Sequence, residues 1–116
     1  MTIKQVMETL DAELLTPEAD LTREVHAACG SDMMSDVLAC VTEDTLLLTG
    51  LVNGQCVRTC EMLDVPCVVF VRSKEPLADA LALAREIDLP MLKTPYTMFE
   101  SCARLYTAGL KPVELG

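Results

Sequence analysis

The 116-residue chain has little aromatic character: it has no tryptophan, two phenylalanines and two tyrosines, so aromatic residues make up only 3% of it. Hydrophobic residues still reach 51%, and we therefore expect a core of Leu, Val, Ala, Met and Cys. A chain of this length can bury a core large enough to fold without disulfides. No apolar run approaches the roughly 18 residues of a membrane-spanning helix, which argues against a membrane as partner.

Basic residues are scarce as well. Nine Lys and Arg stand against 18 Asp and Glu, and the net charge is −9. The phosphate backbone of a nucleic acid would repel such a surface, and no cluster of Lys or Arg offsets the repulsion. We therefore expect no nucleic-acid partner, and we look instead for a small ligand or a protein.

The N-terminus lacks the basic segment with an apolar centre that marks a secretory signal, so we expect a cytoplasmic protein. Six cysteines, at positions 29, 40, 56, 60, 67 and 102, fit a reducing compartment. Most of them lie within apolar patterns, where free Cys behaves as a small hydrophobic residue. The alternative is a cysteine-based redox or metal-responsive protein using Cys56, Cys60 and Cys67. Their spacing matches no common zinc or iron–sulfur motif, and we expect neither a bound metal nor another cofactor.

Hydrophobic spacing predicts alternating helices and strands. From Val25 onward each strand is followed by a helix, which is typical of a mostly parallel sheet with helices on both faces. We therefore predict a single α/β domain over residues 1–116, a three-layer α/β/α fold with about five strands. Strands are expected at 12–15, 25–29, 45–49, 67–71 and 91–93, and helices at 3–10, 32–41, 55–63, 76–87 and 97–108.

Ligands of such sheets bind beyond the carboxyl ends of the strands, and Thr49–Gly50 stands at one such end. An apolar strand stops there, Asn53 follows, and a helix opens, so that backbone N–H groups can face an anion. Gly50 has a second interpretation, a tight turn that requires positive φ. The Lys-Ser/Thr of a P-loop is replaced by Gln55-Cys56, so a tightly bound nucleotide is not predicted.

Three further loops, 30–33, 72–75 and 94–97, are expected at the same edge of the sheet. Asp32 and Asp36 lie four residues apart and share a helical face, although Asp32 is favoured as the N-cap of its helix. Arg58 can reach a phosphate or carboxylate bidentately, but a pair with Glu61 on the same face is the favoured interpretation. His26 is the sole histidine and lies within a predicted strand, so we predict no catalytic pair and no enzyme.

With these loops in place, the chain resembles the DRTGG domain family. The resemblance spans nearly the whole chain and rests on three short segments: Gly30-Ser31-Asp32 with Asp36, Leu48-Thr49-Gly50, and Thr94-Pro95-Tyr96-Thr97-Met98-Phe99. The family is similar in fold to the N-terminal domains of HPr kinase/phosphorylase and of Mur ligases, and it also occurs beside CBS domains. Two positions depart from the family pattern, since Met33 stands near the expected Arg and Leu51 replaces the second Gly.

The resemblance implies a regulatory or accessory module without a known reaction, in some relatives linked to anaerobic, hydrogenase-associated metabolism. We expect such a module to bind a small anionic ligand or a protein partner. Because the chain is apolar and poor in aromatics, we also expect a homodimer. The predicted ligand-binding residues are Asp32, Asp36, Thr49, Gly50, Asn53, Arg58, Thr94 and Tyr96.

Overall fold

The computed structural model describes residues 1–114. These residues form five helices, namely α1 (Ile3–Thr9), α2 (Met34–Cys40), α3 (Gly54–Met62), α4 (Ala78–Glu86) and α5 (Met98–Thr107). They form six strands, namely β1 (Glu13–Leu14), β2 (Ala27–Gly30), β3 (Thr45–Thr49), β4 (Val68–Phe70), β5 (Met91–Lys93) and β6 (Lys111–Pro112). Within this part of the chain, no helix is both long enough and apolar enough to cross a membrane.

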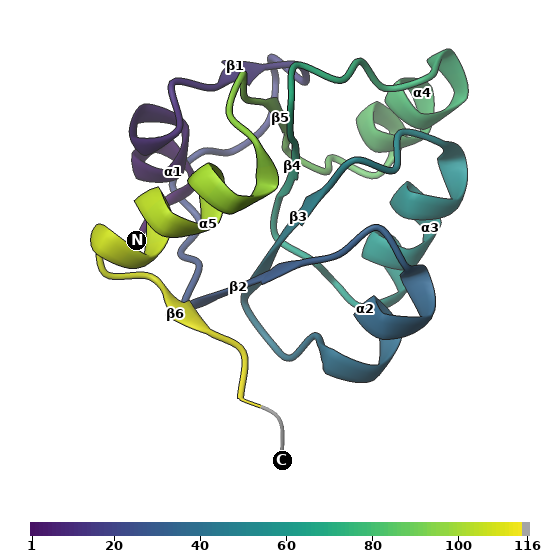
Figure 1. Ribbon diagram of the computed structural model, residues 1–116. Helices are drawn as coiled ribbons and strands as arrows, with labels where there is room; N and C mark the ends of the chain where they lie inside the picture. The colour runs from purple at the N-terminus through teal and green to yellow at the C-terminus, as the bar shows by residue number, and fades with distance from the viewer. Residues whose placement is uncertain (115–116) are drawn as a thin grey trace.

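The strands form one sheet in the order β1-β5-β4-β3-β2-β6. All neighbouring pairs are parallel except β1 with β5, which is antiparallel. Helices α2, α3 and α4 cover one face, and α1 and α5 cover the other (Figure 1). The predicted three-layer α/β/α fold is confirmed. The additional strand is β6, whose two exposed residues carry no strand pattern that the sequence could reveal.

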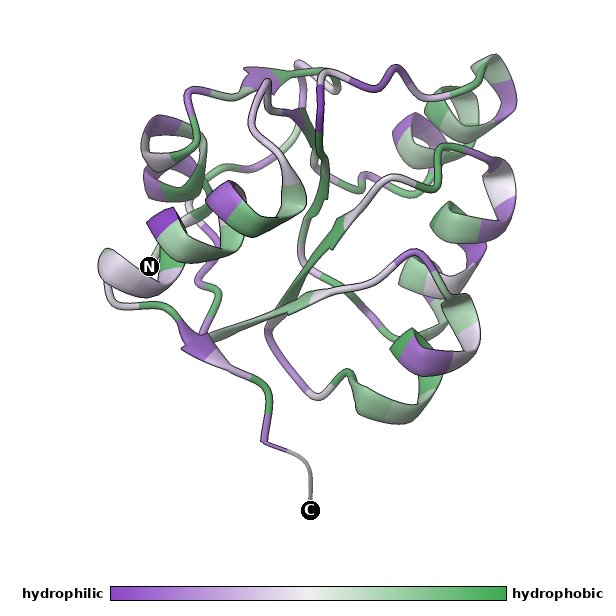
Figure 2. Ribbon diagram, in the orientation of Figure 1, coloured by the Kyte–Doolittle hydropathy of each residue, from purple (hydrophilic) through white to green (hydrophobic). Residues whose placement is uncertain are grey.

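Strand β3 forms the centre of the core. All five of its residues are buried; Leu47 packs against the helices of one face, and Leu46 and Leu48 against those of the other. The unbroken apolar run predicted burial on both faces, because a central parallel strand has helices above and below. Figure 2 shows this as continuous green along the middle strands, while the helices alternate in colour.

The start of helix α4 differs from the sequence prediction. Helix α4 begins at Ala78, two residues after the expected start at 76, and its N-cap residue Leu77 is 53% exposed. The reason is a bond to a segment distant in the sequence, since the Leu77 N–H donates to the Val52 carbonyl at 2.9 Å and holds Leu77 in extended backbone outside the helix. Helix α5 begins at Met98, one residue after the expected start, and Thr97 caps it, because its hydroxyl accepts from the Glu100 N–H.

Candidate functional site

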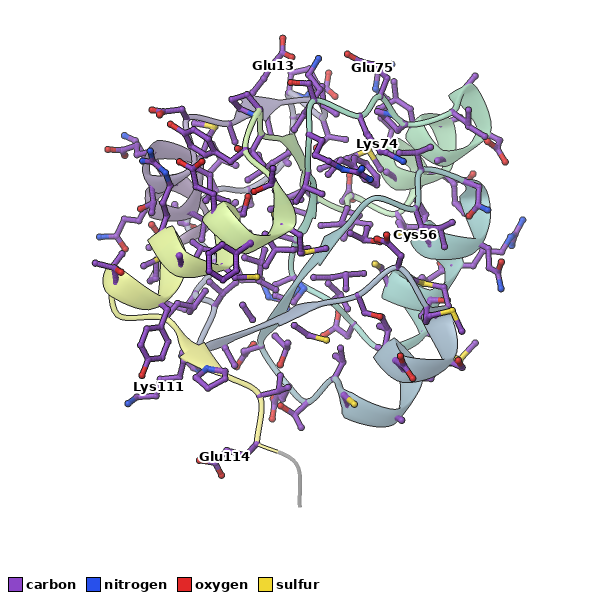
Figure 3. All side chains as sticks on the ribbon, in the orientation of Figure 1. Glu13, Cys56, Lys74, Glu75, Lys111 and Glu114 are labelled. Carbon is purple, nitrogen blue, oxygen red and sulfur yellow. The ribbon has the colours of Figure 1, made fainter. Side chains whose placement is uncertain are left out.

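The carboxyl ends of β2 and β4 and the start of α5 surround a hollow of about 510 Å³. Three of the four predicted loops contribute to it, because parallel strands deliver their following loops to one edge of the sheet. In Figure 3, Lys74 in the loop after β4 and Cys56 in α3 mark this edge of the sheet, and Lys111 in β6 lies well away from it. The hollow is lined mainly by Gly30, Ser31, Asp32, Arg72, Thr97 and Phe99.

Asp32 reaches across from the loop after β2 to the end of β3. One oxygen of its carboxylate accepts from the Gly50 N–H at 2.6 Å and from the Thr49 hydroxyl at 3.2 Å. The predicted N-cap role of Asp32 is wrong, because α2 begins one residue later and Met33 occupies its cap position without a side-chain bond. The Ser31 hydroxyl instead accepts the Met33 N–H. The N–H predicted to face an anion at Gly50 is thus already bonded to a carboxylate of the protein.

Gly50 leaves space at the end of β3, and its backbone angle does not require glycine. Within residues 1–114 the one glycine with positive φ is Gly109, so the turn interpretation of Gly50 is wrong. A Cβ at position 50 would lie 3.2 Å from the Arg72 guanidinium and 3.4 Å from the Asp32 carboxylate. The missing side chain therefore lets a cation and an anion approach the same point at the end of β3.

Arg72 is the residue that the sequence analysis missed, although the loop that carries it was predicted. Arg72 and Ser73 both have left-handed backbone, with φ of 57° and 54°. Two hydrogen bonds of 2.8 Å keep the backbone in this strained conformation. The Arg72 N–H donates to the Tyr96 carbonyl, and the Ser73 N–H donates to the Thr94 carbonyl. This locked turn keeps the exposed guanidinium near Gly50, and across residues 1–114 no carboxylate lies within ion-pair distance of it.

Thr94 and Tyr96 point away from the hollow. The buried Thr94 hydroxyl donates to the Leu10 carbonyl at 2.7 Å. The Tyr96 hydroxyl donates to the Asp11 carboxylate, which raises the pKa of Tyr96, and the Arg104 guanidinium lies 4.0 Å from the centre of its ring. Thr94 and Tyr96 contribute to the site only through their backbone carbonyls, which accept the hydrogen bonds that fix the turn at Arg72 and Ser73.

Three other predicted residues lie apart from this cluster. Asn53 caps α3, accepting the Cys56 N–H at 3.3 Å. Arg58 is exposed on α3, and in the part of the chain that is described it forms no ion pair with Glu61. Asp36 is exposed in the first turn of α2. Of the eight predicted residues, the structure brings three into mutual contact: Asp32, Thr49 and Gly50.

The cysteines do not form a common site. All six are free; Cys56 and Cys60 belong to the core on one face of the sheet, and Cys67 to the core on the other. Burial raises the pKa of the Cys67 thiol, which disfavours a reactive thiolate. Among residues 1–114, no group of three His, Cys, Asp or Glu side chains is arranged to hold a metal. His26 is exposed just before β2 and faces Asp44.

Comparisons with known proteins agree with the predicted resemblance. The family model of the DRTGG domain matches residues 5–108. A solved structure with the same fold contains the CBS and DRTGG domains of the regulatory region of Clostridium perfringens pyrophosphatase, complexed with its activator diadenosine tetraphosphate. It shares 14% identity with a TM-score of 0.69, and the match covers 90% of this chain but only 45% of that one. A search of curated proteins found no match. With a family match over nearly its whole length, the chain belongs to the DRTGG domain family.

Proposed function

We propose that residues 1–116 act as one non-enzymatic, cytoplasmic regulatory or accessory module that binds a small anionic ligand beside Arg72. The observation that carries the proposal is the exposed guanidinium of Arg72, held by a strained turn over a hollow at the carboxyl ends of the strands. Strained backbone persists only where the surrounding structure enforces it, and it is concentrated at functional sites. The link to anaerobic metabolism stays a prediction.

The charge of the surroundings supports this role for Arg72. Three other cations are engaged by carboxylates: Arg23 by Asp44 and Asp64, Lys93 by Glu13 and Glu75, which lie at the top of Figure 3, and Arg104 by Glu100. Six of the nine Lys and Arg side chains form no ion pair within residues 1–114, and Arg72 differs from the other five because it lines the hollow at the carboxyl ends of the strands. A guanidinium binds a phosphate or carboxylate through two parallel hydrogen bonds. Arg72 is therefore the group best suited to fix an anion here.

Further donors and one acceptor surround the same hollow. The N–H groups of Met98 and Phe99 open α5, and in residues 1–114 neither has a backbone acceptor. A helix start favours negative charge through these N–H groups. The second oxygen of Asp32 takes no hydrogen bond within the same residues and is available to a hydroxyl or amine of a ligand. The arrangement suits a ligand whose anionic group lies nearer Arg72 than Asp32.

The comparisons support a regulatory role in general terms. The pyrophosphatase neighbour is a regulatory region, and its activator is a small anionic molecule. The present chain spans less than half of that neighbour, so the ligand proposed here is argued from Arg72 and not from that complex.

A thermal-shift experiment tests the proposal. Inorganic phosphate, pyrophosphate, acetyl phosphate and nucleotides are added in turn, and binding to the native state must raise the unfolding temperature. We expect a rise with at least one anion, and we expect Arg72→Gln to abolish it. Arg85→Gln is the matched control, because Arg85 is exposed in the last turn of α4 and carries the same charge. No shift with any anion, or equal shifts in both variants, would overturn the proposal.

We also propose that the chain forms a homodimer. Six large hydrophobic side chains are exposed in the part of the chain that is described: Met33, Leu38, Met62, Leu77, Phe99 and Tyr106. Four of them lie at α2, α3 and α4 on one side of the sheet, and Phe99 and Tyr106 lie seven residues apart on α5 on the other. A dimer would bury one of these two groups. Light scattering should give about twice the chain mass of 12.7 kDa; a mass near 12.7 kDa at working concentration contradicts the dimer.

A further inference from the structure

A second hollow, of about 350 Å³, lies between α5 and the outer edge of β2. Its walls are largely apolar and include Ala28, Leu48, Cys102, Leu105 and Tyr106. Gly30 and Phe99 line both this hollow and the one beside Arg72. The two hollows are therefore neighbours, with Phe99 standing between them.

The second hollow is open because the outer edge of β2 is only partly covered. Strand β6 pairs with only the first two residues of β2, Ala27 and Ala28. On the side of β2 that faces away from β3, Cys29 and Gly30 therefore have no neighbouring strand in residues 1–114. Gly30 has no side chain, and the Met98 sulfur packs close against it, since a Cβ there would lie 2.8 Å from that sulfur. The backbone of Gly30 therefore contributes to the floor of both hollows.

Phe99 makes the junction unusual. Its side chain is 85% exposed, the most exposed large hydrophobic residue in the part of the chain that is described. It lies one residue inside α5, so its position is fixed by a helix and not by a loop. An exposed ring on a fixed backbone, next to a guanidinium without an ion-pair partner in residues 1–114, provides a surface on which a flat apolar group can stack.

We propose that the ligand of this domain is an anion that carries an apolar or aromatic body. Its anionic group lies at Arg72, and its body crosses the ring of Phe99 into the second hollow. The inference rests on the proposed function, because it assigns a chemical class to the ligand of the same site. An inorganic anion would leave the second hollow wet, whereas a ligand of this class removes apolar surface from water on both sides.

The test compares inorganic phosphate with phenyl phosphate and 1-naphthyl phosphate by titration calorimetry. All three share the anionic group, and only the last two have an aromatic body. We expect the aryl phosphates to bind roughly tenfold more tightly than inorganic phosphate, which corresponds to burying a part of one ring. Phe99→Ala should remove this gain and leave phosphate affinity unchanged. Met62→Ala is the control, since Met62 is 74% exposed on α3 at the opposite face of the sheet.

A second readout does not depend on any variant. In methyl NMR spectra, the aryl phosphates should shift the resonances of Leu48 and Leu105, which line the second hollow, and inorganic phosphate should not. Equal affinities for all three anions, with Leu48 and Leu105 unmoved, would overturn the inference and leave the proposed function standing. Absence of binding by all three would overturn the inference, and it would overturn the proposed function as well only if the thermal-shift series also shows no binding. A change in molecular mass in Phe99→Ala without a change in aryl phosphate affinity would assign Phe99 to self-association and also overturn the inference.

Discussion

At the scale of single residues, Asp32 decides how the candidate site is built. Its carboxylate accepts a hydrogen bond from the Gly50 N–H, the group that the sequence analysis predicted to face an external anion. A loop N–H at the end of a buried strand must find an acceptor, and a carboxylate is the strongest acceptor available. The bond also ties the loop after β2 to the end of β3, and so shapes the wall of the hollow.

Replacing Asp32 should therefore cost stability. We expect Asp32→Ala to lower the free energy of unfolding by about 1–2 kcal/mol, because the Gly50 N–H loses a charge-assisted bond that solvent partly screens. Urea denaturation measures the change. Asp36→Ala is the matched control, and because Asp36 is exposed it should stay within about 0.5 kcal/mol of the wild type. Equal losses in both variants would contradict a role for the Asp32 bond.

Ser101 is a residue whose loss should stabilise the protein. Its hydroxyl is fully buried on α5, and within residues 1–114 it has no hydrogen-bond partner. Burying a hydroxyl without a partner costs about 1–3 kcal/mol, so Ser101→Ala should raise the free energy of unfolding by about 1 kcal/mol. Thr94→Val provides the contrast: it removes a buried hydroxyl that does bond, to the Leu10 carbonyl, and should lower stability. If both variants lose stability in urea, Ser101 must have a partner in solution.

At the scale of elements, the agreement with the sequence prediction is best for β3 and β5, and it is poorer for the starts of β2 and α4, which lie two residues later than expected. The limits of β3 and β5 are those expected, because an apolar run bounded by polar residues leaves little choice. Helix starts depend on bonds to distant segments, such as that from Leu77 to the Val52 carbonyl, and no local pattern contains these. Strand β6 was missed for the same reason, since Lys111 and Pro112 pair with β2 through topology alone.

Hydrogen exchange should reveal an ordering of the strands. We expect the amides of Leu46, Leu47 and Leu48 in β3 to exchange most slowly, because β3 has a strand on each side and every residue in it is buried. The amides of Glu13 in β1 and Lys111 in β6 should exchange much faster, since these are two-residue edge strands. Mass spectrometry of peptic peptides resolves the difference. Comparable protection at the edges would mean that another surface covers them.

At the scale of the whole molecule, strand order explains which parts of the site could be predicted. The alternation of strands and helices predicts which loops lie at the carboxyl edge of the sheet. Asp32 lies near Thr49 and Gly50 because these residues stand at the ends of the neighbouring strands β2 and β3. Arg72 approaches Gly50 because β4 lies next to β3 and the turn after β4 is left-handed. No sequence pattern indicates that an arginine will adopt left-handed backbone, so the position of the Arg72 side chain could be found only from the structure.

Net charge should shape how an anion reaches the site. At low ionic strength the charge of −9 repels an approaching anion over a longer range than one arginine attracts it. We therefore expect the association rate of an anionic ligand to rise when salt is increased from about 10 to 150 mM. Stopped-flow fluorescence with a labelled aryl phosphate measures the rate. A rate that falls over this range would show that the field of Arg72 governs the approach.

The pairing of β6 with β2 also determines where other modules can be attached. The Met1 amino group contacts the Val25 carbonyl, and Lys111 pairs with Ala27, so both ends of the described chain lie at the start of β2. Arg72 and Asp32 lie beyond the other end of the strands. A fused reporter or a tandem domain joined at either end would leave the guanidinium open to solvent, and circular permutation through a short linker should join the two ends without disturbing the strained turn.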